Sequence, residues 1–509
     1  MNHHISRQLL SQLSEFVSRQ LGLHFPEKRW RDLERRMIHA ARDLGFKNGE
    51  ACAQWLVSSR VPRAEIEILA SHLTIGETYF FREKGGFDVL ESRILPELIG
   101  SRRGREQRLR IWSAGCSSGE EAYSIAILLK RMIPDIDEWN VTILATDINP
   151  RSLAKAAAGI YSDWSFRGVP DWVKQRYFAR RGDGRLEVPY AIRKMVTFAN
   201  LNLAEDTFPS LVNNTNAMDI IFCRNVLMYF GTEQAAKVTG NFHRALLDGG
   251  WLLVSPCEVS SAIFAEFEAV TFPGAAFYRK NGTGQRPAPA PCRPHREESR
   301  LHLPEQLPVP DFFAVPRPPL PPETGQEQAP PPQQPKPSAY EEALALHRRG
   351  EYREAAATLQ GFLSGIEEAG PLHPLYGKAA ALLAQLFADL GNLEEALRWS
   401  GAAIAADKLN AELHYLRATI CQERGAIDEA VTALKRALYL DHTFVLTHFA
   451  LGNLTLKQGK QKESDRHFDN ALELLGTYRD DDPLPGGDGM TAGRLAEIIG
   501  STRAAVRRT

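Results

Sequence analysis

The sequence has few of the features that mark membrane, secreted or nucleic-acid-binding proteins. No run approaches 18 consecutive apolar residues, so no membrane span is predicted. Six cysteines among 509 residues are scattered without a CxxC pair, which gives neither zinc-ligand spacing nor a disulfide framework. The net charge of −1 argues against a nucleic-acid partner. Because residues 1–4 lack the charged-then-apolar layout of a signal peptide, we expect a cytoplasmic protein without membrane insertion.

Proline is abundant, and it is concentrated in one place. Of the 31 prolines, 17 lie between Asn281 and Pro337. Proline fixes φ and lacks a backbone donor, so this segment is predicted to be a disordered, semi-rigid linker over 281–337; a ligand for proline-recognising domains is the alternative. The linker separates two predicted folded bodies, 1–280 and 338–478, which we expect to work independently, and a tail follows at 479–509.

The second body has a 34-residue repeat. Gly391, Gly425 and Gly459 keep this period, and so do three alanines, at 403, 437 and 471. The pattern predicts helix pairs at 380–390 and 393–406 and at 416–423 and 427–440, with each glycine ending the first helix of a pair. It resembles the tetratricopeptide repeat (TPR), with a degenerate copy at 340–363, and predicts an all-α solenoid that binds an unidentified peptide or protein partner.

The clearest local signal in the first body is a strand that ends in a turn of small residues. A strand at 109–114 is followed by Gly115-Cys116-Ser117-Ser118-Gly119 and then by a helix rich in Ala, Ile and Leu. Small residues let a backbone approach a ligand closely, although many such turns are simply tight. A second strand ends at Asp147, where an acid usually binds ribose hydroxyls. Its alternative role is to cap the helix 150–158.

Further strands at 218–223 and 249–255 alternate with helical segments. This order predicts an α/β, Rossmann-like, mostly parallel sheet, with ligands at the carboxyl ends of its strands. The Gly-Lys-Ser/Thr of a phosphate-binding loop is missing, and the first turn lacks the full Gly-x-Gly-x-x-Gly. A ribose-binding acid without a phosphate anchor suits an adenosine cofactor that has no phosphates. We therefore predict S-adenosyl-L-methionine, with S-adenosyl-L-homocysteine as product, and no metal.

Five segments in order resemble the CheR-type chemotaxis receptor methyltransferases. They are 78–83, 112–121, 145–148, 202–203 and 221–230. The resemblance covers a methyltransferase domain at 73–280 with a small β insertion at about 159–196, whose residues 181–185 predict a hairpin turn. Residues 1–72 fit the family's N-terminal helical domain. A proline-rich linker with tetratricopeptide repeats is similar to Wsp-type and Frz-type members of the family.

The resemblance also implies a set of site residues. The cofactor would be bound by Thr78, Arg82, Glu121, Asp147, Asn202, Leu203, Arg224 and Asn225, and the catalytic residues would be Arg82 and Tyr229. Asp147 would hold the ribose and Asn202 the adenine edge, with Leu203 beside it. Glu121 would pair with the cofactor's amino group or else be a helix-terminal charge. The alternative for Arg224 is a surface ion pair, and for Asn225 a turn residue.

The implied reaction is methyl transfer to glutamates in the cytoplasmic domain of a methyl-accepting chemotaxis receptor, giving methyl esters. Glutamate has a pKa of about 4.3, so the nucleophile is already ionised and needs no general base. Arg82 would orient this carboxylate, and Tyr229 would hydrogen-bond it or pack on the sulfonium. Two alternatives remain: a catalytically weak S-adenosylmethionine-binding scaffold or sensor that acts through its repeats, and a small-molecule methyltransferase.

Overall fold

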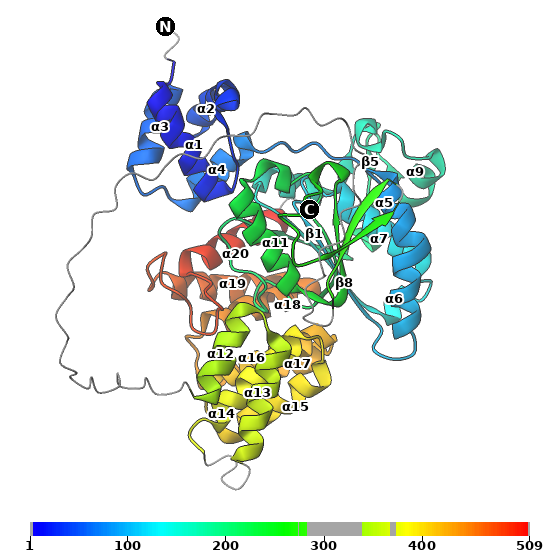
Figure 1. Cartoon of the computed structure of the whole chain (residues 1–509), viewed down its shortest axis with the longest axis vertical. Coiled ribbons are helices and arrows are strands. Elements are labelled where there is room, and N and C mark those ends of the chain that lie inside the picture. The colour runs from blue at the N-terminus through cyan, green and yellow to red at the C-terminus, as the bar shows by residue number, and fades with distance from the viewer. Residues whose placement is uncertain (1–3, 273, 282–337, 367–372, 507–509) are drawn as a thin grey trace, which may run out of the picture.

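The computed structural model describes residues 4–272, 274–281, 338–366 and 373–506 (Figure 1). Apart from residue 281, the predicted proline-rich linker lies outside the described residues. The N-terminal segment folds as four helices: α1 (Arg7–Leu21), α2 (Trp30–Asp43), α3 (Gly49–Ser58) and α4 (Arg63–Leu73). Their apolar faces meet in a small core around Leu13, Val17, Leu33 and Met37, all fully buried. This agrees with the helical segment predicted over residues 1–72.

The central feature is a seven-stranded sheet in the order β6-β2-β1-β7-β8-β10-β9. Its strands are β1 (Arg108–Ala114), β2 (Asn140–Asp147), β6 (Val196–Asn200), β7 (Met218–Phe222), β8 (Leu246–Val254), β9 (Glu268–Phe272) and β10 (Ala275–Arg279). The pairs from β6 to β8 are parallel, whereas β9 and β10 add antiparallel pairs at one edge. The predicted strands correspond to β1, β2, β7 and β8, and the mostly parallel sheet is confirmed; β6, β9 and β10 were not predicted.

Side chains of β1 alternate between two cores, one on each face of the sheet. Leu109 and Ile111 belong to the core that α7 (Glu120–Met132) covers. Trp112 points to the opposite core, where its ring lies 5.3 Å from that of Phe242 in α11 (Thr232–Ala245). The other helices of this half are α5 (Lys84–Val89), α6 (Leu95–Arg102), α8 (Pro150–Ala158), α9 (Asp171–Tyr177) and α10 (Tyr190–Arg193). The sheet is therefore covered on both faces, as an α/β fold requires.

The predicted β insertion forms a small antiparallel sheet of its own. It contains β3 (Ile160–Tyr161), β4 (Ala179–Arg180) and β5 (Leu186–Glu187), in the order β3-β5-β4. The amide of Arg181 donates to the carbonyl of Arg185 at 2.8 Å, closing the turn between β4 and β5. The predicted hairpin is confirmed.

The second body is a run of paired helices. The pairs are α12 (Ala339–Arg349) with α13 (Tyr352–Gly365), α14 (Tyr376–Asp389) with α15 (Leu393–Ala406), α16 (Ala411–Arg424) with α17 (Ile427–Leu440), and α18 (Val445–Lys457) with α19 (Gln461–Leu475). Gly350, Gly391, Gly425 and Gly459 follow the first helix of each pair with φ between 75° and 85°. This left-handed conformation is the reason that the 34-residue pattern uses glycine. The repeat array was thus predicted correctly, degenerate first copy included.

The same turns of three successive repeats pack on the methyltransferase half, at the edge where the strands begin. Gly350 lies against Arg244, Gly391 against Leu247, and Gly425 against Asn140, the first residue of β2. The side-chain amide of Asn140 donates a hydrogen bond of 2.6 Å to the backbone carbonyl of Glu423, which lies at the end of α16. The halves are therefore in direct contact, which the prediction of two independent bodies did not anticipate.

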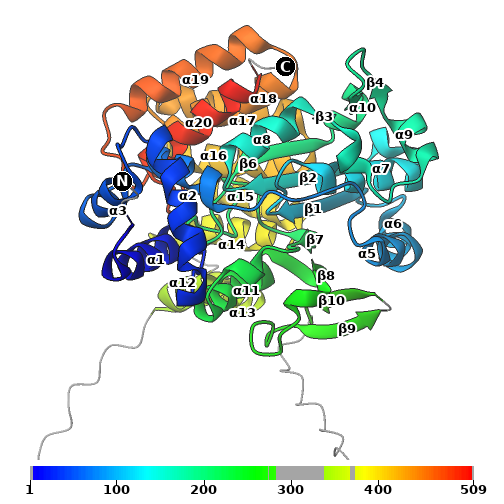
Figure 2. The same cartoon turned by 90° about the horizontal axis from the view of Figure 1, so that it is seen from above.

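The predicted tail contains a further helix, α20 (Ala492–Val506), which packs against α19, α8 and β6 (Figure 2). It thus covers the edge strand of the sheet on the side away from β9. This helix was not predicted, because it lies outside the 34-residue repeat.

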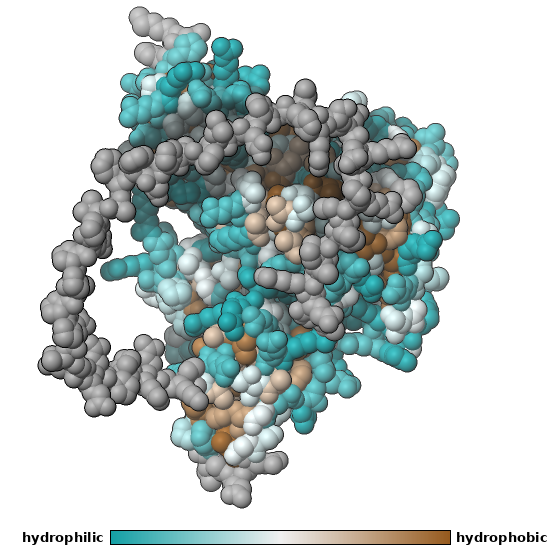
Figure 3. Space-filling model, in the orientation of Figure 1, coloured by the Kyte–Doolittle hydropathy of each residue, from teal (hydrophilic) through white to brown (hydrophobic). Residues whose placement is uncertain are grey.

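In the view of Figure 3 the array shows an apolar patch near the α12–α15 end, and further apolar residues are exposed on the methyltransferase half. Within the described part of the chain, every helix is too short or too polar to cross a bilayer.

Candidate active site

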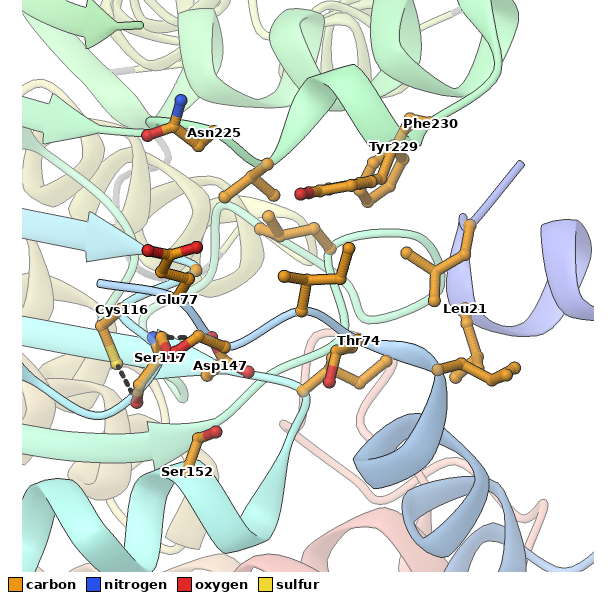
Figure 4. Close-up of a pocket in the computed structure, with 18 of the residues that line it drawn as sticks. Leu21, Thr74, Glu77, Cys116, Ser117, Asp147, Ser152, Asn225, Tyr229 and Phe230 are labelled. Carbon is orange, nitrogen blue, oxygen red and sulfur yellow. Dashed lines mark hydrogen bonds between the residues drawn. The ribbon is translucent and has the colours of Figure 1, made fainter. Parts of the chain in front are cut away.

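A pocket lies at the carboxyl ends of β1, β2, β6 and β7, on the opposite edge of the sheet from the repeats (Figure 4). All nine residues that the sequence suggested lie on its wall: Thr78, Arg82, Glu121, Asp147, Asn202, Leu203, Arg224, Asn225 and Tyr229. They come from segments up to 151 residues apart, from Thr78 to Tyr229, and the parallel sheet brings them together.

The turn after β1 forms the floor of the pocket. The amides of Gly115 and Cys116 both donate to the carbonyl of Thr146, at 2.8 and 2.9 Å, which folds the turn onto the end of β2. Gly115 has φ +80°, and a Cβ there would lie 2.4 Å from a methyl of Val226. Only glycine fits this position, because both the backbone conformation and the neighbouring side chain exclude a larger residue.

Asp147 links this turn to the end of β2. Its carboxylate accepts a hydrogen bond from the amide of Ser117 at 2.8 Å (Figure 4). It also accepts from the amide of Asn149 at 2.8 Å. Burial raises its pKa, and these backbone donors act in the opposite direction. The cap of α8 is Asn149, whose side chain accepts from the amides of Arg151 and Ser152. Asp147 is therefore not the helix cap, and it lies on the pocket wall.

The buried pair of Arg224 and Glu121 lies on another wall. The Arg224 side chain is 2% exposed, and its guanidinium lies 3.2 Å from Glu121 and 3.1 Å from Glu83. Glu121 also accepts from the Ser113 hydroxyl at 2.7 Å. Burial raises the pKa of Glu121, although Arg224 opposes this shift. These two residues are thus not surface charges.

Asn225 and the loop around it are held by Glu258, which was not among the predicted site residues. Its carboxylate accepts from the amides of Asn225 and Val226 at 2.7 Å, and from those of Met228 and Ser255 at 3.2 and 3.1 Å. Asn225 has φ +57°, a strained value for a residue other than glycine. One sign of this role is present in the sequence, because Glu258 is an acidic residue that stands a few positions after the fourth predicted strand, 249–255.

Asn202 has its side chain engaged within the protein. Its amide nitrogen donates to the carbonyl of Gln20 in α1 at 2.7 Å, and its carbonyl oxygen accepts from Ala204 at 3.0 Å. The backbone amide of Asn202 donates to Asp206 at 2.6 Å. The side chain therefore anchors this loop to the N-terminal helices, in addition to any contact with a ligand.

Arg82 and Tyr229 lie on the wall of the same pocket. Arg82 donates to the carbonyl of Glu77 at 2.8 Å and is partly exposed. The hydroxyl end of Tyr229 points toward the space between the labelled side chains (Figure 4). Both side chains are placed to contact a molecule that enters from solvent.

The N-terminal helical segment closes the pocket, which the motifs did not indicate. The end of α1 and the segment after it contribute the lining residues Leu21, Leu23, His24, Phe25 and Arg29. The amide of His24 donates to the carbonyl of Tyr229 at 2.6 Å, and Leu23 pairs with Phe230. Since these are apolar or backbone contacts, composition alone gave no signal for them.

Comparisons with known proteins agree with this geometry. Residues 76–272 match the family described as CheR methyltransferase, SAM binding domain, and residues 418–459 match a TPR repeat. The chain is 35% identical over 260 residues to the chemotaxis protein methyltransferase of Borreliella burgdorferi, covering 51% of this chain and 90% of that protein. The chain belongs to this methyltransferase family. It therefore contains an S-adenosylmethionine-binding domain and is an S-adenosylmethionine-dependent methyltransferase with C-terminal TPR repeats, as predicted.

Other relatives match a similar part of the chain. The chemotaxis protein methyltransferase Cher2 of Pseudomonas putida is 31% identical over 275 residues, which are 53% of this chain and 97% of that protein. Chemotaxis protein methyltransferase 1 of Pseudomonas aeruginosa is 38% identical over 221 residues, 42% of this chain and 77% of that protein. Among solved structures, MamA 41-end from Desulfovibrio magneticus RS-1 covers 27% of this chain and 75% of its own, with 22% identity and a TM-score of 0.25.

Proposed function

We propose that this methyltransferase transfers the methyl group of S-adenosylmethionine to glutamate side chains of a methyl-accepting chemotaxis receptor, forming methyl esters. The observation that carries the proposal is the gathering of nine motif residues around one pocket in a chain of this family. The substrate class is suggested by the relatives, which are named chemotaxis protein methyltransferases.

The pocket suits the cofactor. Gly115 lets the turn pack closely on Val226, and both residues line the pocket. Asp147 offers carboxylate oxygens for ribose hydroxyls, and Glu121 offers a buried negative charge for an amino group. The side-chain oxygen of Asn225 is buried and has no partner among the described residues, so a bound donor would satisfy it. When bound, S-adenosylmethionine supplies an electrophilic methyl group on a positively charged sulfur.

The chain's own residues align the acceptor and exclude water. A glutamate carboxylate is already ionised near neutral pH, so no proton has to be removed before attack. Arg82 carries a forked donor that fixes the angle of this carboxylate without taking part in bond formation. Tyr229 and the apolar residues after α1 cover the site, which strengthens electrostatic interactions inside it.

We assign the remaining parts by position. Residues 1–72 form the helical domain, 73–280 the methyltransferase domain with its insertion at about 159–196, and 338–478 the TPR repeats. The linker is 281–337, and the tail is 479–509. In this proposal the repeats dock an unidentified protein partner that localises or regulates methylation, in a chemosensory or surface-sensing pathway of the cytoplasm.

Transfer of tritium from labelled S-adenosylmethionine to a receptor fragment, in a base-labile form, tests this function. We expect Asp147→Ala to weaken cofactor binding by about tenfold or more, because charge-assisted hydrogen bonds to the ribose are lost. Arg82→Ala should leave affinity for the cofactor nearly unchanged and slow transfer. Wild-type protein that binds the cofactor but transfers no label to receptors would instead favour the alternative of a scaffold or sensor.

A further inference from the structure

Helix α20 reaches the loop that follows β6 in the cofactor pocket. Arg494 in α20 is 7% exposed, and its guanidinium donates to the carbonyl of Asn200 at 2.5 Å and to the carboxylate of Asp206 at 2.9 Å. Asn200 is the last residue of β6, directly before the pocket-lining residues Leu201, Asn202 and Leu203. A residue 294 positions away in the chain thus contacts the backbone of this loop.

Asp206 transmits this contact to Asn202. The oxygen that accepts from Arg494 also accepts from the backbone amide of Asn202 at 2.6 Å. Asp206 also accepts a forked pair of hydrogen bonds from Arg63 in α4, at 3.0 Å to its other oxygen and at 3.1 Å to the same oxygen. Burial would raise the pKa of Asp206, but Arg494 and Arg63 outweigh it, so the pKa is lowered and the carboxylate stays ionised.

The charges around Arg494 are buried together, which makes the contact more than a surface ion pair. Side-chain exposure is 8% for Arg494 and 10% for Asp206. Glu497, one turn further along α20, lies 2.9 Å from Arg63. Removing one partner from such a cluster leaves a buried charge without compensation, a much larger effect than losing an exposed pair.

We propose that Arg494 is a positioning residue for the cofactor site, through which α20 fixes the loop from Asn200 to Asp206. The proposal rests on the assignment of Asn202 and Leu203 to the S-adenosylmethionine site. Arg494 holds both ends of the loop's first turn, the carbonyl of Asn200 directly and the amide of Asn202 through Asp206. The C-terminal helix thereby completes a binding site built otherwise from the first half of the chain.

This support comes from the C-terminal part of the chain. The Pseudomonas putida relative is matched over 97% of its length by 53% of this chain. Such a relative has too little sequence left for a counterpart of the repeats and α20. In this chain, α20 packs on α19, so the repeat array reaches the cofactor loop through one helix.

Three full-length variants test the role of Arg494: Arg494→Ala, Arg494→Lys and Arg503→Ala. Calorimetry with S-adenosylhomocysteine, without any receptor, gives the dissociation constant. We expect Arg494→Ala to weaken binding by about tenfold, from the loss of charged hydrogen bonds, and to raise KM for S-adenosylmethionine with kcat largely retained. Lysine can pair with Asp206 but cannot also reach the carbonyl of Asn200. The affinity of Arg494→Lys for S-adenosylhomocysteine should therefore lie between those of wild type and Arg494→Ala. Arg503→Ala removes an ion pair of the same helix and should bind as wild type.

Two further measurements separate positioning from general destabilisation. Hydrogen exchange of the amides at 201–206 should accelerate in Arg494→Ala, while amides in β1 keep their protection. A double-mutant cycle with Asp206→Asn should be non-additive in cofactor affinity, because both changes break one network. Unchanged affinity in folded Arg494→Ala, or an equal loss in Arg503→Ala, would overturn the proposal. Since calorimetry and hydrogen exchange are carried out without a receptor, a failure of receptor methylation would not affect these two results.

Discussion

Replacing Gly115 by alanine is a direct test of how the cofactor turn is built. The residue has φ +80°, and an added Cβ would lie 2.4 and 3.4 Å from the two methyl carbons of Val226. Real Cβ atoms do not approach other carbons to 2.4 Å, so either the turn or the loop of Val226 must move. Both segments line the pocket, and any shift would alter it.

The expected loss in the free energy of unfolding of Gly115→Ala has two contributions. Holding alanine in a left-handed conformation costs about 1–2 kcal/mol. Forcing a methyl group into a packed contact costs about a further 1–3 kcal/mol. The sum predicts a loss of about 2–5 kcal/mol in the free energy of unfolding, or an equivalent displacement of the loop that weakens cofactor binding at least about tenfold.

Gly104 offers a matched control. Its φ is +73°, and an added Cβ would have no neighbour within 4 Å. Gly104→Ala should therefore lose only the free energy of holding alanine in a left-handed conformation. Urea unfolding and calorimetry with S-adenosylhomocysteine are measured for both variants. The double variant Gly115→Ala/Val226→Ala removes the clashing methyl carbons and should recover about 1–3 kcal/mol relative to the sum of the single changes. Equal losses at Gly115 and Gly104, without any recovery, would refute the steric argument.

Two other substitutions probe buried carboxylates. Glu258→Gln replaces one accepting oxygen by an amide that cannot accept, so two of four backbone hydrogen bonds are lost, at about 1–3 kcal/mol each; urea unfolding should show the loss, and cofactor affinity should fall. Asp389→Asn, at the end of α14, removes a carboxyl whose pKa burial raises to about 6, although His347 opposes the shift. Because its folded pKa exceeds the unfolded value of 3.8, ionisation lowers wild-type stability as pH rises from about 4 to 6. The variant should therefore gain up to about 3 kcal/mol relative to wild type between pH 4 and pH 8, measured by unfolding at both.

Substitutions of exposed carboxyl groups provide the controls for Glu258→Gln and Asp389→Asn. Glu268→Gln on β9 and Asp407→Asn after α15 change surface side chains and should have little effect at any pH. If Glu258→Gln is no more harmful than Glu268→Gln, Glu258 does not support the loop of Asn225. A constant difference between Asp389→Asn and wild type across this pH range would mean that Asp389 has an ordinary pKa in the folded protein.

The site residues were predictable where a motif carried them. Asp147 and Arg224 each follow a buried strand, and parallel strands place their carboxyl ends at one edge, so strand order sufficed to bring them together. Glu258 and His24 were missed because their contributions are hydrogen bonds with distant backbone groups. Such contacts have no periodicity, so the sequence showed an acid after the fourth predicted strand but not the backbone groups that it binds.

The sequence by itself determined the kinds of structure in each half. Strand, turn and helix order specified an α/β methyltransferase domain, and the 34-residue period specified paired helices, because both depend on local conformation and on repeating apolar positions. Only the tertiary structure decided how the halves meet. The repeat turns pack at Arg244, Leu247 and Asn140, and Arg494 reaches the cofactor loop. These contacts join residues more than a hundred positions apart, and their partners are selected by surface shape and buried charge in the folded molecule.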